Sequence, residues 1–278
     1  MSPETSGIMQ TPFGSLKKKR ASKRRSTLAS TIMLLASLSA GVLIWHLVST
    51  YMFSSILFPG PLQVGTEAIA EIQSGSIFVD IGASMFRILA GFLIGSVIGI
   101  VLGLLVGFFP IVRSLFNPYL QFFRFIPPIA WVSPAMIWFG VGEESKIFII
   151  IYGTVFTVSL STALGVAGVH TNKIRAAQMF GATEWQIFRW VIVPAAVTPI
   201  LQGMRIAMGI AFMTVIAAEM LAANAGIGYS ILNARLWMAT DKIFVGIFTL
   251  GILGYLTDKI LEVAIHRFGR RFDSNAKR

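Results

Sequence analysis

Six long apolar runs divide this chain of 278 residues, and each has the length of a membrane-spanning helix. The hydrocarbon core of a bilayer is about 30 Å thick, so a helix that crosses it needs about 20 consecutive apolar residues. The composition agrees, because 55% of the residues are hydrophobic and only 13% are charged, too few for the surface of a water-soluble globule. The sequence therefore predicts an all-α polytopic membrane protein. The predicted spans cover residues 30–53, 84–109, 115–138, 147–169, 199–221 and 243–265.

Positively charged residues predict the direction in which the chain crosses the membrane. Loops rich in Lys and Arg stay in the cytoplasm, and seven such residues lie between Lys17 and Arg25. The segment 54–83 holds three acidic residues and no Lys or Arg, as expected of an outer segment. Six crossings then place both termini in the cytoplasm. We expect a basic tail over 1–26, a transmembrane domain over 27–268 and a second basic tail over 269–278.

Missing residue types and motifs exclude several function classes. The chain has no cysteine, which excludes disulfides and thiolate ligands, and its histidines, His46, His170 and His266, are too scattered for a metal site. The net charge of +11 lies in blocks beside apolar runs, which favours contact with membrane lipid over nucleic-acid binding. No GxxxxGK(S/T) motif occurs, so the chain lacks an ATP site of its own. We expect it to bind no cofactor.

A polar island at 170–190 interrupts the apolar pattern and is too polar to span a membrane. Ile174, Ala177 and Phe180 or Gly181 fall on one face at helical spacing, and small residues there allow another surface to approach closely. Gly181 ends this helix, and Thr183 can cap a second short one. The island therefore predicts a bent pair of short helices that serves as a docking knob. An ordinary loop with a glycine hinge is the alternative.

The island resembles the EAA motif of ABC-importer permeases, in which E-A-A, three residues, G, nine residues and I-x-L-P follow one another. Here the pattern is Arg175-Ala176-Ala177, Gly181 and Val191-x-Val193-Pro194, with Arg175 in place of the motif's Glu. By this resemblance the coupling loop is 170–190, and its ATPase-coupling residues are Arg175, Ala176, Ala177, Gly181, Ala182, Glu184 and Pro194.

The resemblance extends over nearly the whole chain and points to the permeases of the nitrate, sulfonate, taurine and bicarbonate group. It implies a type I ABC-importer permease fold in a bacterial inner membrane, with ATP and Mg held by two partner ATP-binding subunits. It also implies a second permease subunit, commonly an identical one, and an external substrate-binding protein. The further matching stretches are Phe58–Pro61, Arg87–Phe92, Arg124–Trp131, Gly203–Gly209, Ala218–Met220 and Gly226–Tyr229.

Charged residues inside apolar spans are costly and usually line a cavity or serve function. Arg124 precedes Pro127 and Pro128, whose missing N–H groups predict a break that lines the translocation path, although Arg124 could equally reach lipid phosphates from the interface. We also place Arg205 near the path. Glu219 lies about 21 Å further along the same helix and cannot pair with it. We expect Glu219 near the outer face, closing a gate with Arg235 or the partner subunit, or serving as a simple rim carboxylate.

Two further observations concern the second predicted span. Arg87, at its start, is more typical of a structural anchor than of a substrate ligand. Glycines recur there at every fourth position from Gly91 to Gly107, which forms a strip that lets another helix approach closely. We favour packing within the subunit over a dimer contact for this strip.

The predicted function is ATP-driven import of a small anion by alternating access. An intramembrane serine protease fits poorly, because it needs a nucleophile and a base at one depth, whereas the histidines lie near span ends. The stronger alternative is a secondary transporter driven by an ion gradient. Such folds usually show inverted repeats, and we find none in this sequence.

Overall fold

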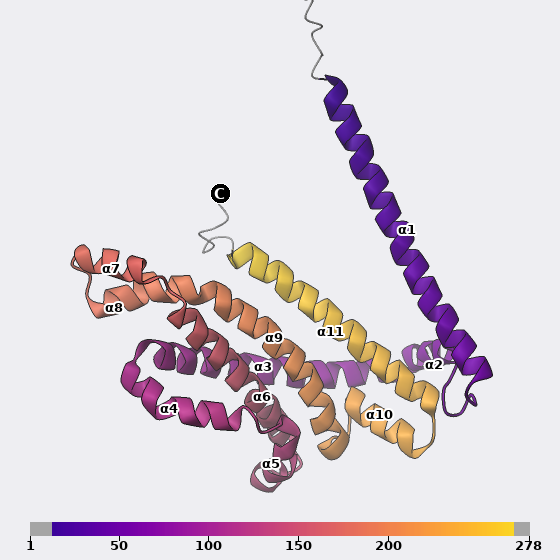
Figure 1. The fold of residues 1–278 in the computed structure, drawn as a ribbon. Coiled ribbons are helices and arrows are strands. Elements are labelled where there is room, and N and C mark those ends of the chain that lie inside the picture. The colour runs from indigo at the N-terminus through magenta and orange to yellow at the C-terminus, as the bar shows by residue number, and fades with distance from the viewer. Residues whose placement is uncertain (1–12, 270–278) are drawn as a thin grey trace, which may run out of the picture. The chain divides into compact units, whose positions relative to one another are not determined.

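The computed structural model describes residues 13–269, all of them in helices or in the connections between helices. They fall into two units, which divide after Gln63. The first unit contains α1 (Phe13–Tyr51), whose part from Thr31 to Tyr51 is long and apolar enough to cross a membrane (Figure 1). After α1, the indole Nε1 of Trp45 donates a hydrogen bond of 3.1 Å to the carbonyl of Pro59 and holds the chain turn at 52–60.

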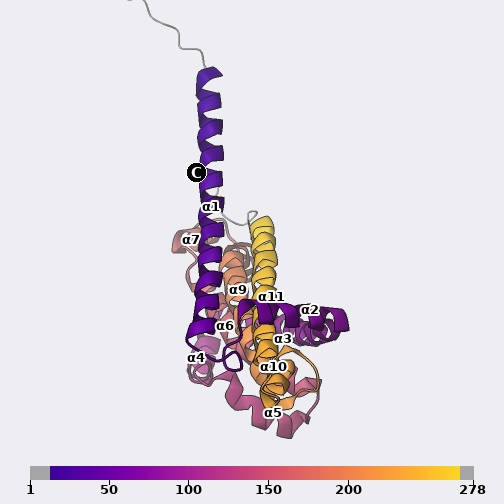
Figure 2. The ribbon, with the colours of Figure 1, turned by 90° about the vertical axis from the view of Figure 1, so that its right-hand side faces the viewer.

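The second unit begins within α2 (Pro61–Ser74) and holds the remaining helices. Its long helices α3, α6 and α9 lie side by side, as the two views in Figures 1 and 2 show. The elements after α2 are α3 (Ser76–Phe108), α4 (Pro110–Phe123), η1 (Pro128–Trp131), α5 (Val132–Phe139), α6 (Glu143–Ala167), α7 (Thr171–Met179), α8 (Glu184–Ile187), η2 (Phe188–Ile192), α9 (Val193–Ala222), α10 (Ile227–Leu236) and α11 (Thr240–Gly269).

The structure confirms the predicted spans but changes the third. Among residues 13–269, five helical runs are long and apolar enough to cross a membrane, and α4 with η1 and α5 forms a sixth only as a pair bent by 91°. Proline disfavours helical backbone in the residue before it, so Ile126 and Pro127 are both pushed away from the helix, and Pro127 is extended. The third predicted span, 115–138, is therefore a bent pair, and the break at the two prolines was predicted correctly.

The glycine strip of α3 packs against α6 within the subunit, as favoured from the sequence. A Cβ atom added at Gly103 would lie 2.5 Å from the carbonyl oxygen of Ser159 and from Cβ of Thr162, so only glycine fits there. The contacting residues recur at every fourth position on both helices, so the contact continues along the length of the helices. The glycines Gly91, Gly95, Gly99, Gly103 and Gly107 face Ile150, Thr154, Val158, Thr162 and Val166 in turn.

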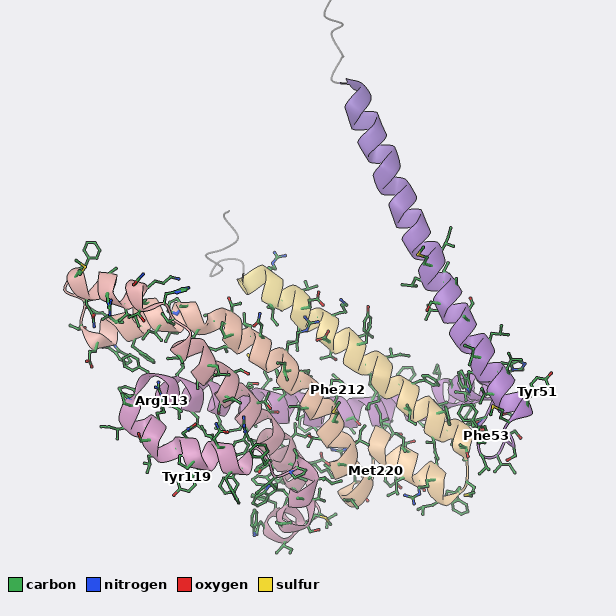
Figure 3. The ribbon with its side chains drawn as sticks, in the orientation of Figure 1. Tyr51, Phe53, Arg113, Tyr119, Phe212 and Met220 are labelled. Carbon is green, nitrogen blue, oxygen red and sulfur yellow. The ribbon has the colours of Figure 1, made fainter. Side chains whose placement is uncertain are left out.

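Apolar side chains of α3, α6 and α9 form the main core. Ile88, Ile150 and Val215 are fully buried in it, and Phe212, labelled in Figure 3, lies at its α11 side. Arg113, also labelled there, donates to the carbonyls of Val106 and Gly107 and so satisfies the end of α3 at the turn into α4. This core fixes the spacing of α6 and α9, the two helices that lead to the polar island.

The domain boundaries at 26 and 268 remain predictions. Residues 1–12 of the predicted basic tail lie outside the described residues, and residues 13–26 form the first turns of α1. Residues 270–278 of the second tail also lie outside them.

Candidate functional site

The predicted knob exists, and its bend is built by backbone hydrogen bonds. After α7, the N–H of Gly181 donates to the carbonyl of Gln178 (2.9 Å), and the N–H of Ala182 donates to the carbonyl of Ala177 (3.1 Å). This pair of bonds is the Schellman arrangement, which needs a left-handed residue after the helix end. Gly181 supplies it with a φ of +77°. The structure thus confirms that Gly181 ends the first helix of the island.

Thr183 begins the second helix through a reciprocal cap. The N–H of Gln186 donates to Thr183 Oγ1 (3.4 Å), and the N–H of Thr183 donates to Gln186 Oε1 (2.8 Å). Two backbone N–H groups that lack helical partners are satisfied in this way. The predicted cap is confirmed.

The second helix is not short, which corrects the expectation of two short helices. α8 continues through the π turn of η2 into α9, so that Glu184–Leu221 forms one helical run of 38 residues. Pro194 lacks the N–H for a bond to the preceding turn. It stands at the first turn of α9, directly after the wider turn of η2, where the helix tolerates this loss. The knob is therefore joined to the span without a flexible break.

One face of the knob packs on its own subunit. Ile174, Ala177 and Ala182 contact a cluster around the buried side chains of Ile187 and Ile192. Ala177 is half-buried and packs partly on this cluster, and its expected contact with a partner stays a prediction. This face was expected to continue to Phe180 or Gly181, but α7 ends at Met179 and the Phe180 side chain after it is exposed.

Three large apolar side chains of the knob are exposed. The side chains of Met179, Phe180 and Trp185 are 89%, 92% and 66% exposed. We call these three residues the knob tip. Exposed apolar side chains of this size, when they lie together, are typical of a protein contact.

Polar and small coupling residues surround the knob tip. Arg175, Ala176, Gly181 and Glu184 are exposed, whereas Pro194 is half-buried. Within residues 13–269, no ion pair is formed by Arg175, so its charge remains available to a partner.

Two of the predicted path residues line a common cavity of about 290 Å³. Arg124 and Pro128 reach it from the bend between α4 and η1, and Tyr152 and Thr157 reach it from α6. Pro127 lies at the same bend but is not among the lining residues. The guanidinium of Arg124 lies 4.7 Å from the ring centre of Phe125.

Arg205 was expected near the path, but it turns toward α11. Its Nε and Nη2 donate to the two carboxylate oxygens of Asp258 at 2.6 Å each, and Nη2 also donates to Glu262 at 3.0 Å. A charge in an apolar span is stabilised by such pairing. Arg205 does not line the Arg124 cavity, and its place near the path stays a prediction.

Glu219 was expected near the outer face, closing a gate with Arg235 or the partner subunit or serving as a rim carboxylate. Within the described residues it is buried in an ion pair with Arg87, and its place near the outer face stays a prediction. Arg87 Nη1 donates to Glu219 at 2.7 Å, and the Ser84 hydroxyl and the Gly228 N–H donate to the same carboxylate at 2.8 and 2.9 Å. These contacts leave the carboxylate fully enclosed. An enclosed carboxylate must be paired because burial of a lone charge is very costly.

Arg87 joins three helices and a turn, so its predicted role as an anchor is confirmed. Besides Glu219 of α9, its Nε and Nη2 donate to the carboxylate of Glu143 on α6 at 2.6 and 2.7 Å, and Nη1 donates to the carbonyl of Ala225. Gly226 follows with a φ of +121°, and a Cβ there would lie 2.5 Å from Glu219 Cδ.

Asp80 and Ser84, which complete this cluster, were not predicted from the sequence. Asp80 accepts the N–H of Gly226 at 2.8 Å, and the Ser84 hydroxyl accepts the N–H of Ile227 at 2.9 Å. Their one signal in the sequence is the occurrence of polar side chains near the start of a span that also carries Arg87. No group of three or more potential metal-ligating side chains occurs within 13–269.

The described residues form an all-helical domain with five or six candidate membrane spans and a projecting knob, the architecture of a polytopic membrane protein. Residues 95–273 match the family of binding-protein-dependent transport system inner membrane components, and the chain belongs to this family. It is the permease of a binding-protein-dependent ABC importer and a multi-pass protein of the inner membrane. ATP hydrolysis belongs to its partner subunit, and such a system includes a substrate-binding protein.

Individual relatives cover most of the chain. A probable ABC transporter permease protein of Brucella melitensis is 40% identical over 84% of this chain and 94% of the relative. The taurine transport system permease protein TauC of Escherichia coli is 34% identical over 85% of this chain and 87% of its own length. Among solved structures, an inward-facing MetNI methionine ABC transporter chain matches the fold with a TM-score of 0.51. It is 19% identical, and the match covers 72% of this chain and 95% of that chain.

Proposed function

We propose that this permease imports a small anion by alternating access, as one half of a homodimer that works with two ATP-binding subunits. The observation that carries the proposal is the Arg124 cavity, which a cationic side chain lines and which no described Asp or Glu reaches. The similarity to a taurine permease supports a small sulfonate as the first candidate, with nitrate and bicarbonate as the other members of the group.

The chemistry of the cavity suits passage rather than tight binding. The Tyr152 hydroxyl donates to the carbonyl of Phe123 (2.6 Å) and the Thr157 hydroxyl to that of Gly153 (3.3 Å), so both protons are already engaged. Arg124 is then the strongest donor to an anion. A single guanidinium attracts an anion without enclosing it, and transport requires a site that releases as readily as it binds.

Coupling to ATP hydrolysis occurs through the knob tip. Complete burial of an apolar side chain contributes about 1.5–3 kcal/mol, so Phe180 alone can change the affinity of a docking contact by tenfold or more. Movement of the docked knob passes along the continuous helical run from Glu184 to Leu221. Since α9 packs along α6, this movement reaches the helices that carry the Arg124 cavity.

A second copy of the chain supplies the missing wall of the path. Leu164 of α6 and Ile206 and Met213 of α9 are 64%, 60% and 76% exposed in the single subunit. They lie on the two helices that line the cavities, which favours a partner there over lipid alone. Both termini lie in the cytoplasm in this arrangement, because the Lys- and Arg-rich segments and the knob then share the ATPase side.

The test is uptake by the assembled transporter, reconstituted with its ATPase and its binding protein in proteoliposomes. We expect ATP-dependent uptake of a labelled sulfonate, nitrate or bicarbonate that persists with a protonophore. Arg124→Gln should raise the anion concentration for half-maximal uptake, whereas Arg205→Gln should leave this concentration unchanged because Asp258 already neutralises that arginine. Uptake that stops with the protonophore, or a cation as the transported species, would reject the proposal.

A further inference from the structure

A second cavity lies beside the root of the knob and meets the Arg124 cavity. It measures about 460 Å³ and lies between the end of α6, the start of α7 and the first turns of α9. Ser161 lines both cavities. The lining residues of the two cavities therefore follow one face of α6 from Tyr152 to its end at Ala167, a rise of about 22 Å.

The same continuity holds on α9. Ile210 lines the Arg124 cavity, and Ile206, Gln202 and Pro199 line the knob cavity at successive helical turns. We call the combined feature the α6–α9 groove. Gly203 backs directly onto Ser161, and a Cβ at this glycine would overlap the serine side chain. The meeting point of the two cavities is thus held by close contact of the two helices.

The groove has cationic groups at both ends and no described carboxylate along it. Arg124 lies at one end, and His170 and Lys173 line the other. A different cavity, of about 580 Å³, lies between α2 and α10 and has the opposite character, since Glu67, Glu71 and Asp80 line it with a single lysine. The cationic lining is therefore a property of the groove rather than of the whole surface.

We infer that the α6–α9 groove is the inward half of the anion route, and that His170 and Lys173 form its release site for a small oxyanion. This inference rests on the proposed function and extends it, because it names the residues through which the anion leaves. A lysine ammonium is a compact charge on a flexible stem, which suits brief contact with a departing anion. A cleft lined by charges of one sign raises the local concentration of the opposite ion by tenfold or more.

Single cysteine substitutions test the inference, because the natural chain contains no cysteine. Thr157→Cys, Ser161→Cys and Gln202→Cys place a thiol in the groove. Leu93→Cys serves as control, since Leu93 is 57% exposed on α3 and lines neither cavity. Each variant of the assembled transporter in inside-out vesicles is treated with an anionic ethylsulfonate thiosulfonate reagent and with its cationic trimethylammonium counterpart. Uptake by each variant is measured in parallel.

We expect the anionic reagent to modify the groove thiols about tenfold faster than the cationic one. Adding Lys173→Gln to Ser161→Cys should remove most of this preference. Arg189→Gln, which removes a similar charge from an exposed position outside both cavities, should leave the preference unchanged. Equal rates for both reagents, or groove thiols no more reactive than Leu93→Cys, would overturn the inference even if anion uptake is intact. Anion-selective labelling in a transporter that carries no anion would instead overturn the proposed function.

Discussion

Substitution of Gly181 should weaken binding of the ATPase through backbone conformation rather than side-chain bulk. A Cβ at this position meets no atom of the subunit within 4 Å, so the fold itself has room for a side chain. The backbone φ of +77° at Gly181 is what restricts the choice of residue at this position. A left-handed conformation costs an ordinary residue about 1–2 kcal/mol, whereas Asn adopts it more readily.

The expected order of affinity for the ATPase is therefore Gly, Asn, Ala and then Val at position 181. A cost of 1–2 kcal/mol corresponds to a dissociation constant about 5–30 times higher for Gly181→Ala. Titration of the purified ATPase against permease variants in nanodiscs measures this. If Gly181→Asn binds the ATPase as weakly as Gly181→Val does, side-chain bulk determines the affinity, and the argument from backbone conformation fails. If Gly181→Ala binds like the natural chain, the left-handed turn is not required for docking.

Three further substitutions probe the fold and the knob. Gly103→Val should lower the melting temperature of the detergent-solubilised protein, since overpacking costs about 1–3 kcal/mol, whereas Gly209→Ala, with no atom within 4 Å of the new Cβ, should not. Arg87→Ala should destabilise the protein by about 3–5 kcal/mol because it leaves Glu219 buried without its partner; a melting temperature equal to that of the natural chain would contradict this. Thr183→Ala should cost the knob about 1 kcal/mol through loss of the cap, seen as weaker ATPase binding, and unchanged affinity would exclude a role for the cap.

Local rules predicted the parts of this protein that depend on neighbouring residues. The apolar runs predicted the spans, the four-residue glycine period predicted a close helix contact within the subunit, and Gly181 and Thr183 predicted the bend of the knob. In each of these features the decisive atoms lie within one helix or turn, or on a repeating helix face.

Contacts between distant helices could not be predicted in the same way. Glu219 pairs with Arg87, which lies 132 residues away in the chain, and Arg205 pairs with Asp258 at a separation of 53 residues. Charge alone does not say which helices lie side by side. The exposure of Phe180 was equally hard to predict, because a shift of one residue in the end of α7 decides whether Phe180 continues the buried face or leaves it.

The most direct test of the central claim, that the knob docks the ATPase, is copurification from native membranes in detergent. Phe180→Asp places a charge on the knob tip, and Trp237→Asp is the matched control because Trp237 is 79% exposed at the end of α10, outside the knob. The ATPase should accompany the natural chain and Trp237→Asp but not Phe180→Asp. An ATPase that remains with Phe180→Asp at full yield, or that is absent from the natural chain, would contradict the assignment of the knob.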